Sequence, residues 1–324
     1  MRIRIVCYED VDAWILGKFA LKLSGCLNNK GIDTDIAKTP DTKADINHHI
    51  IYYNYNGLRT NLDTIMITHI DQQWKTEKVK MQLKNAEMGI CMSQSTKKQL
   101  IDEGLPKSKL CYINPAHDSV IIPRKLIIGI LSKTHADCRK KETLLKDICK
   151  RISFLDYKFV IMGMGWQQIV DELRNLNFDI EYYNEFNYDV YKNLVPRLDY
   201  FLYFSFDEGS MAFLDALAAG VPTIVTPQGY HLDAKKGITY AIDDKVDSII
   251  RVLNNILQGR NDRINSVKEW TWENYADKHL LVWQYLLQNR NKKFLKMNYK
   301  NYNDGISSIS PQPFKNRLKK MINN

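Results

Sequence analysis

Residues 199–233 read DYFLYFSFDEGSMAFLDALAAGVPTIVTPQGYHLD. The apolar run Tyr200–Phe206 predicts a buried strand that ends at Asp207–Gly209, and a short helix is predicted to follow with Ser210 near its amino end. The segment GVPTIVT (220–226) ends that helix with a glycine and a proline and begins another strand. Such a unit belongs to a parallel sheet. Its turn is where these sheets bind ligands, because unpaired amides at a helix start attract anions.

Two acids, Asp207 and Asp215, lie eight residues apart on either side of this helix start. Amides suit a diphosphate and carboxylates suit sugar and ribose hydroxyls, so the arrangement indicates a nucleotide sugar. The segment resembles the signature of retaining GT-B glycosyltransferases of the family 4 type, E-G-F-G-x-x-x-x-E-A-x-A-x-G-x-P. Here DEGSMAFLDALAAGVP takes that place, with aspartates for both glutamates. Glu208 is an alternative for the first acid, with one residue less spacing.

The resemblance implies an α/β fold of GT-B architecture, with two facing Rossmann-like domains and an interdomain cleft. It also implies a transferase that moves a sugar from a nucleotide-diphosphate donor, by default UDP-linked, to a hydroxyl acceptor with retention. Asp207 would position the sugar, Asp215 the ribose, and the amides of Gly209–Met211 the diphosphate. No metal or other cofactor is expected, since the nucleotide sugar is a co-substrate.

Phosphate chemistry requires cations near the helix start, and the family places them after the first strand of its second domain. In IIGILSKTHADCRKKETLL (127–145), Lys133 matches the first of these cations and Lys140 the second. Arg139 and Lys141 compete with Lys140, and Lys141 stands where relatives have a glycine. Such cations would neutralise the charge that builds on the leaving diphosphate.

Two weaker motifs also resemble this family. FVIMGMGW (159–166) resembles the strand and G-x-G turn that open the next βα unit, with Gly163 as its first glycine. In MITHID, the residues His69 and Asp71 follow a buried strand, where relatives often have a histidine facing the donor sugar. We therefore expect a site role for both residues.

The first loop, after the strand predicted at 2–8, contains three acids that we expect to contact the acceptor, as this loop does in relatives: Glu9, Asp10 and Asp12. D-x-D is a metal-binding signature in the different GT-A fold, where it lies well inside the nucleotide domain. Here it lies in the first loop, so we predict no catalytic metal.

Alternating strand and helix patterns occur twice along the chain, which predicts two Rossmann-like domains. The predicted strands are 2–8, 46–54, 63–69, 87–92, 109–114, 126–131 and 158–162, besides those of the signature. The predicted helices are 13–29, 75–86, 94–103, 141–152, 167–175, 188–195 and 245–258. We expect an acceptor domain over 1–120, a donor domain over 121–287 with a closing helix at 270–287, and a basic tail over 288–324.

The chain of 324 residues is 44% hydrophobic and 26% charged, which is typical of a globular protein of about two domains. No apolar stretch approaches the roughly 20 residues of a membrane span, and no signal peptide is recognisable at the start. Six scattered cysteines without a C-x-x-C pair indicate buried thiols in a reducing cytoplasm.

The net charge of +9 is concentrated in residues 288–324, where nine basic residues oppose one acid. This segment also contains an apolar helical stripe of Phe314, Leu318, Met321 and Ile322. It is either a basic amphipathic end that rests on an anionic membrane or a solvated tail. A nucleic-acid partner is not predicted, because the body of the chain is not basic. The expected location is the cytoplasm, peripheral to the inner face of the membrane through this tail.

The expected acceptor is a glycan or a lipid-linked acceptor, in surface polysaccharide or glycolipid assembly. An alternative hypothesis is a non-catalytic sugar-nucleotide-binding partner subunit, or a UDP-sugar epimerase on the same fold. The two aspartates support this alternative, because each shortens the reach of a carboxylate by one methylene.

Overall fold

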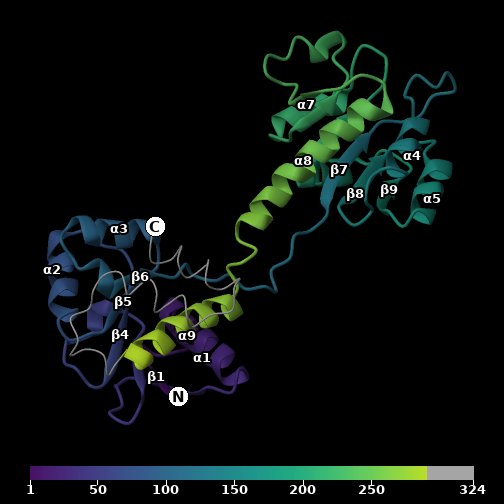
Figure 1. The fold of residues 1–324 in the computed structure, drawn as a ribbon. Helices are drawn as coiled ribbons and strands as arrows, with labels where there is room; N and C mark the ends of the chain where they lie inside the picture. Colours follow the sequence, from purple (N-terminus) through teal and green to yellow (C-terminus); the bar gives the residue numbers. More distant parts are fainter. Residues whose placement is uncertain (290–324) are drawn as a thin grey trace. The chain divides into compact units, whose positions relative to one another are not determined.

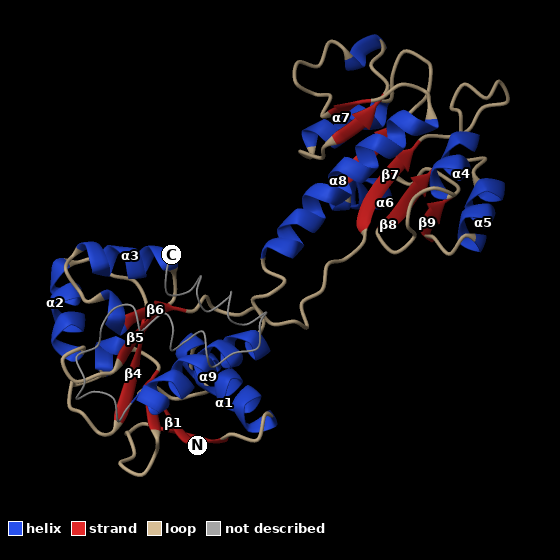
Figure 2. Ribbon diagram, viewed as in Figure 1, coloured by secondary structure: helices blue, strands red, loops and turns tan. Residues whose placement is uncertain are grey.

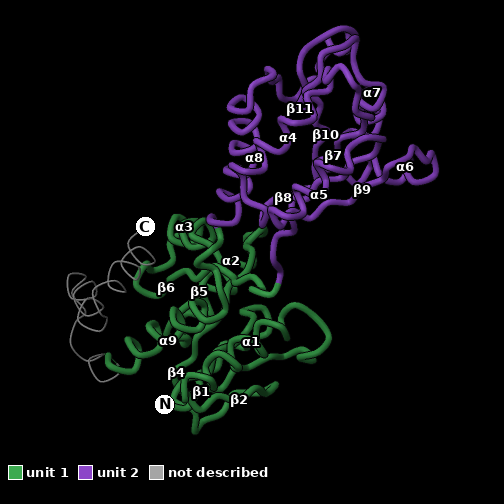
Figure 3. The backbone as a smooth tube through the Cα atoms, turned by 90° about the vertical axis from the view of Figure 1, so that its right-hand side faces the viewer, with its two compact units in different colours: residues 1–120, 267–324 green, residues 121–266 purple. Residues whose placement is uncertain are grey.

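The computed structural model describes residues 1–289, and the predicted basic tail lies almost wholly outside the described residues. Contacts divide the chain into two compact units (Figure 3). Unit 1 contains Met1–Val120 and the chain from Val267 onward, and unit 2 contains Ile121–Ser266. No helix among the described residues is both long and apolar enough to cross a membrane.

Unit 1 contains a six-stranded parallel sheet in the order β2-β1-β3-β4-β5-β6 (Figures 1 and 2). Its strands are β1 (Arg2–Val6), β2 (Asp33–Ala37), β3 (Ile46–His49), β4 (Leu62–Ile67), β5 (Met88–Cys91) and β6 (Leu110–Tyr112). Its helices are α1 (Ile15–Asn29), η1 (Tyr52–Asn54), α2 (Gln73–Gln82), α3 (Gln94–Asp102), η2 (Lys107–Lys109) and α9 (Trp272–Asn289). Helices α1 and α9 bury one face of the sheet, whereas α2 and α3 pack on the other.

Unit 2 contains a second six-stranded parallel sheet, in the order β12-β11-β10-β7-β8-β9. Its strands are β7 (Leu126–Leu131), β8 (Tyr157–Met162), β9 (Asp179–Tyr183), β10 (Tyr200–Tyr203), β11 (Thr223–Val225) and β12 (Tyr240–Ala241). Its helices are α4 (Thr143–Cys149), α5 (Gln167–Asn175), α6 (Tyr188–Leu194), η3 (Val195–Arg197), α7 (Met211–Ala218), η4 (Gly229–His231) and α8 (Val246–Ser266). The two sheets confirm the predicted α/β class with two Rossmann-like domains, as a GT-B architecture requires.

Several boundaries differ from those predicted. Strand β3 ends at His49, because the chain turns into the short helix η1 at Tyr52. Helix α8 continues to Ser266, well beyond the predicted end at 258. The strands β2 and β9 were not predicted, because these two edge strands, with the sequences DTDIA and DIEYY, mix acids into a partly exposed strand. A strand of this kind lacks the continuous apolar run of a central strand.

The closing helix belongs to unit 1, and not to the donor domain over 121–287 in which we predicted it. In α9, Trp272, Tyr275 and Trp283 are buried in the core cluster of unit 1. Phe19 of α1 contacts the ring of Trp272 at 5.3 Å between centroids, in an edge-on arrangement. The physical reason is the aromatic face of this helix, which buries against α1 and the first sheet.

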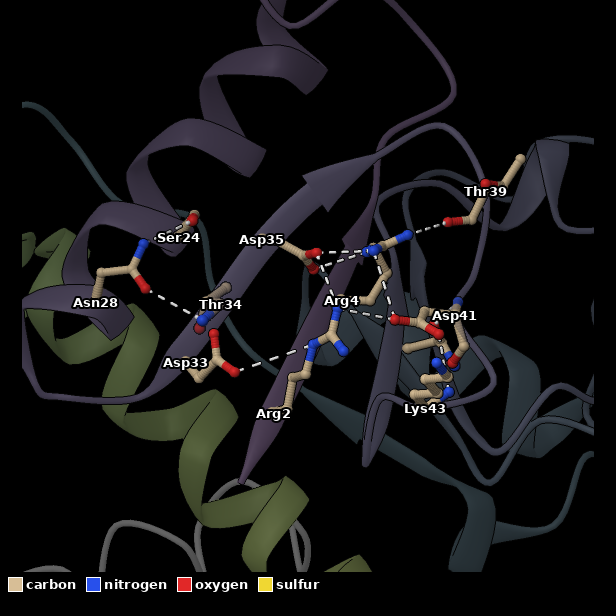
Figure 4. A network of polar contacts seen from close by, with 11 residues as sticks. Arg2, Arg4, Ser24, Asn28, Asp33, Thr34, Asp35, Thr39, Asp41 and Lys43 are labelled. Atoms are coloured by element: carbon tan, nitrogen blue, oxygen red, sulfur yellow. Dashed lines mark hydrogen bonds and ion pairs between the residues drawn. The ribbon is translucent and has the colours of Figure 1, made fainter.

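A network of charged residues covers the part of the unit 1 sheet where no helix packs (Figure 4). The connection from β2 to β3, residues 38–45, contains no helix. Arg4 donates two hydrogen bonds of 2.7 Å to the two carboxylate oxygens of Asp35, and Asp41 lies 2.9 Å from Arg2. The hydrogen bond to Asp35 raises the pKa of Arg4. These bidentate contacts let an uncovered strand pair face water without apolar exposure.

Two buried histidines lie where α9 packs on the sheet, His48 in β3 and His279 in α9. Trp283 Nε1 donates to Thr64 Oγ1 at 3.2 Å, and Thr64 Oγ1 lies 3.0 Å from His48 Nδ1. His279 Nδ1 donates to the Tyr275 carbonyl at 2.9 Å. The two imidazole rings lie 5.0 Å apart, and the Nε2 atoms of both His48 and His279 are buried without a hydrogen-bond partner. Burial lowers the pKa of both histidines, which favours neutral imidazoles.

We expect the free energy of unfolding to fall as the pH decreases from about 6.5 to 4. Burial lowers the pKa of His279 from 6.5 to about 4, with a smaller contribution from Lys278, so protons bind the unfolded chain first. The cost for His279 alone reaches about 3 kcal/mol at pH 4. Urea unfolding at several pH values measures the slope. His279→Gln, which is neutral at every pH, should flatten it; an unchanged slope would contradict this cause.

Candidate functional site

The carboxyl ends of β7 and β10 form the topological switch point of unit 2. The chain adds β8 and β9 on one side of β7, and then returns to add β10, β11 and β12 on the other. Open parallel sheets bind ligands outside the carboxyl ends of their strands at such a point. The loops after β7 and β10 meet there, since the Phe206 amide donates to the Arg139 carbonyl at 3.0 Å. The structure thus brings the two predicted donor segments together.

An ion pair between Lys140 and Asp207 lies at the centre of this site. Lys140 Nζ is 2.5 Å from Asp207 Oδ2 and 2.6 Å from the Tyr203 hydroxyl, and only 8% of Lys140 is exposed. The Tyr203 hydroxyl donates to Asp207 Oδ1 at 2.6 Å. Two residues that were predicted from separate motifs are therefore direct partners, and a buried tyrosine from the end of β10 connects them.

The carboxylate of Asp207 makes three contacts within the protein and is 22% exposed. Besides Lys140 and Tyr203, it accepts the Gly209 amide at 3.1 Å. Burial alone would raise the pKa of Asp207, but the hydrogen bonds from Lys140 and Tyr203 lower it. The carboxylate thus stays ionised and shapes the turn. Asp207 was predicted to hold the sugar, whereas its contacts here hold the turn, and the neighbouring Glu208 is the exposed acid.

The amino end of α7 is partly occupied by a buried histidine. The Ser210 amide donates to His231 Nε2 at 2.9 Å, and His231 Nδ1 lies 3.4 Å from the Thr226 carbonyl. Burial lowers the pKa of His231, which favours the neutral ring that this geometry needs. Asp207 therefore accepts a hydrogen bond from the Gly209 amide, and His231 accepts one from the Ser210 amide. The Met211 amide is the member of the predicted cradle that neither side chain occupies.

The G-x-G turn after β8 packs directly on the loop after β7. Gly163 has φ +146°, and a Cβ there would lie 2.4 Å from the Ser132 carbonyl oxygen. Gly165 has φ +91°, and its Cβ would lie 1.9 Å from Thr134 Oγ1. The glycines are needed because both backbones approach too closely for any side chain. Gly163 thus lets this turn pack against the backbone of Ser132 and of the predicted cation Lys133.

The remaining cations of the loop differ in their surroundings. Lys133 and Arg139 are exposed, and Arg139 lies 3.4 Å from Asp137. Lys141 forms an ion pair with Asp244 and lies over the Phe206 ring. Lys141 also has φ +47°, in the left-handed region, which explains why a glycine suits this position. Of the three competitors, only Lys140 contacts Asp207.

The second predicted acid lies further along α7. Asp215 is exposed and accepts a hydrogen bond of 2.6 Å from the Tyr191 hydroxyl of α6. The two acids therefore have different partners, a lysine and a tyrosine.

The sites predicted in unit 1 lie at the carboxyl ends of its strands. His69 and Asp71 follow β4, and both contact the ammonium group of Lys75, which lies 3.2 Å from His69 Nε2. The acids of the first loop, Glu9, Asp10 and Asp12, are all exposed. Across residues 1–289, no group of histidine, cysteine and acidic side chains is arranged to hold a metal ion.

Sequence reasoning missed Tyr203 and His231, which position the turn and the helix start. Neither residue stands in a motif: Tyr203 ends an apolar strand, and His231 lies beyond the signature in GYHLD. Their roles follow from contacts across the sheet, over 63 and 21 residues of sequence respectively.

Comparisons with known proteins give structural neighbours alone. No family model matches the chain, and no curated protein matches it. Among solved structures, the apo form of the lipopolysaccharide outer core galactosyltransferase WaaB is 14% identical over 91% of this chain and 100% of that chain, with a TM-score of 0.37. A glycosyltransferase from Rickettsia africae is 12% identical over 89% and 99%, with a TM-score of 0.35. Anabaena HepE in complex with UDP and glucose is 11% identical over 92% and 100%, with a TM-score of 0.33. At these scores the matches assign neither activity nor ligand to this chain.

We expect Gly163→Ala to destabilise unit 2 by more than about 1 kcal/mol, because it combines a positive φ with a backbone clash. Gly259→Ala is the matched control. Gly259 lies inside α8, and the nearest atom to its added Cβ is Arg263 Nη1 at 3.8 Å. This control should gain up to about 1 kcal/mol of helix propensity. Urea unfolding measures both variants, and equal effects would show that the G-x-G turn is not constrained.

Proposed function

We propose that this chain is a glycosyltransferase that takes its sugar from a nucleotide-diphosphate donor bound by unit 2. The observation that supports this most is the composition of the switch point, where a buried lysine–aspartate pair shapes a turn that precedes a helix start, with two exposed cations nearby. An anion at this place would meet the first helix amide that no side chain takes, together with positive charge. A diphosphate needs both.

The contacts suggest a division of roles. The exposed Lys133 and Arg139 would bind the diphosphate and neutralise its charge as the glycosidic bond breaks, a contribution of several kcal/mol in comparable sites. Lys140 and Asp207 would act as positioning residues, since each side chain is the ion-pair partner of the other. Glu208 would then accept the sugar hydroxyls, and Asp215 the ribose hydroxyls.

The finer features of the proposal come from the resemblance of the signature segment. They are UDP as the usual nucleotide, retention of configuration without a metal, a site role for His69, and a glycan or lipid-linked acceptor in surface polysaccharide or glycolipid assembly. A cytoplasmic location, peripheral to the membrane through residues 288–324, belongs to the same proposal.

A second candidate is a sugar-nucleotide-binding protein without transferase activity, or an epimerase on the same fold. The observation that favours it is that both oxygens of Asp207 already accept hydrogen bonds within the protein, from Lys140, Tyr203 and Gly209. A carboxylate in that state has little left for a substrate hydroxyl. Turnover measurements separate the two candidates.

The first experiment measures nucleotide binding and donor turnover on the full chain. We expect UDP to raise the melting temperature, because a ligand at 100 times its Kd adds about 2.7 kcal/mol to the free energy of unfolding. We also expect UDP to be released from UDP-sugars when hydroxyl acceptors are supplied. Tight UDP binding without any turnover would favour the second candidate, and absence of nucleotide binding would contradict both.

Two substitutions test the division of roles. Glu208→Gln should lower kcat/KM about 10-fold to 100-fold and leave the melting temperature unchanged, because it removes a charged contact to the substrate alone. Asp207→Asn should lower both kcat/KM and the melting temperature, since Lys140 loses its buried partner. Asp262→Asn, on an exposed part of α8, is the control and should change neither. A fall in activity for Asp207→Asn with full stability would reverse the two assignments.

A further inference from the structure

The topological switch point of unit 1 contains a histidine relay that no motif marks. The chain adds β2 on one side of β1 and then β3 on the other, so the carboxyl ends of β1 and β3 flank the switch. Tyr8 lies two residues after β1, and His49 is the last residue of β3. Ligands of parallel sheets bind outside such ends. Tyr8 is half-buried there, beside the exposed Glu9 and Asp10.

The relay consists of three side chains with defined hydrogen-bond directions. Tyr8 Oη lies 2.9 Å from His49 Nδ1, and His49 Nε2 lies 3.1 Å from Asp63 Oδ1. Asp63 Oδ2 accepts the Thr60 amide at 2.7 Å. A carboxylate only accepts, so His49 donates from Nε2, and in the tautomer whose single proton is on Nε2 the Nδ1 atom is the acceptor. Tyr8 must therefore donate its hydroxyl proton inward.

Of the three side chains in the relay, Tyr8 is the one that is exposed to solvent in part. His49 and Asp63 are 0% exposed, and the ring of Tyr55 covers the imidazole at 4.4 Å between centroids. Burial, and then the charge of Asp63, raises the pKa of Tyr8 to about 12, so Tyr8 keeps its proton. Because that proton points inward, the lone pairs of the Tyr8 oxygen are left to accept a hydrogen bond. A buried imidazole–carboxylate pair is also a poor way to stabilise a core. Apolar residues of similar volume often give an equal or higher free energy of unfolding at such a place.

The charge around Tyr8 selects the kind of ligand. The first loop presents carboxylates at Glu9, Asp10 and Asp12, in contrast to the cations Lys133 and Arg139 of unit 2. An oxygen that only accepts, beside negative charge, disfavours phosphates and favours neutral groups that donate hydrogen bonds. Sugar hydroxyls are groups of this kind.

We propose that Tyr8, oriented by His49 and Asp63, is the residue of unit 1 that binds a hydroxyl of the neutral sugar accepting the transferred group. The identity of this ligand as the acceptor rests on the proposed function, whereas the preference for neutral hydroxyls over phosphates rests on the relay and the charge of its loop. Tyr8 is a binding residue, and His49 and Asp63 are positioning residues.

The relay makes a specific prediction for Asp63→Asn. The Thr60 amide holds one oxygen of the side chain, so the new amide group would face His49 Nε2 and donate to it. The imidazole proton must then move to Nδ1, and Tyr8 must turn its own proton outward. Nitrogen-15 NMR of histidine-labelled full chain measures this directly: the proton of His49 should lie on Nε2 in the wild type and on Nδ1 in Asp63→Asn. The same tautomer in both proteins would overturn the relay.

The binding test uses methyl glycosides and the corresponding sugar phosphates as probes on the same labelled chain. We expect at least one methyl glycoside to shift the His49 resonances, and Tyr8→Phe to weaken that binding about threefold to tenfold, the value of one neutral hydrogen bond. Tyr53→Phe, which removes an exposed hydroxyl elsewhere in unit 1, should leave it unchanged. No shift with any glycoside, equal binding by Tyr8→Phe, or tighter binding of the phosphates would overturn the proposal.

A separate titration with UDP keeps the two proposals distinguishable. UDP should bind wild type and Tyr8→Phe equally, because its site lies in unit 2. Absence of UDP binding by the wild type would contradict the proposed function. The preference of Tyr8 for neutral hydroxyls would then be decided by the glycoside titration. Bound UDP without a Tyr8-dependent glycoside would contradict only the inference on Tyr8.

Discussion

The contact between Lys140 and Asp207 is the interaction on which the candidate site depends. It joins the loop after the first strand of unit 2 to the loop after its fourth, across the point where the strand order reverses. A lysine that is 8% exposed needs an anionic partner, and an aspartate beside it stays ionised for the same reason. The Tyr203 hydroxyl accepts a hydrogen bond from Lys140 and donates one to Asp207. The shape of the turn, and therefore the start of α7, follows from this group of three.

Both switch points in the chain use a buried ionisable pair to position a more exposed residue, but with opposite charge around it. In unit 2 the pair supports a helix start with cations near it, which suits an anion. In unit 1 the pair of His49 and Asp63 supports the hydroxyl of Tyr8 within an acidic loop, which suits a neutral donor of hydrogen bonds. Two sheets of the same topology class thus offer complementary chemistry, which is what the proposed transfer from a charged donor to an uncharged acceptor would require.

Most of the architecture could be predicted because it depends on local patterns. Apolar runs such as 126–131 become central strands, and glycines such as Gly220 end helices through their own backbone freedom. The prediction failed at the sheet edges β2 and β9, where exposure interrupts the apolar pattern. The helix α9 was predicted, but its assignment to the second domain was wrong, because its aromatic face has the same periodicity whichever unit it packs against.

The sequence by itself determined the alternation of strands and helices, the G-x-G turn, the signature segment, and the position of Lys133 and Lys140 after the first strand of unit 2. Each of these depends on neighbours in the chain. Only the tertiary structure decided that Asp207 is held by Lys140 and Tyr203, that His231 takes the Ser210 amide, and that Tyr8 meets His49 and Asp63. These partners come from different strands, and the order of strands in a sheet, which no local pattern records, sets which side chains meet.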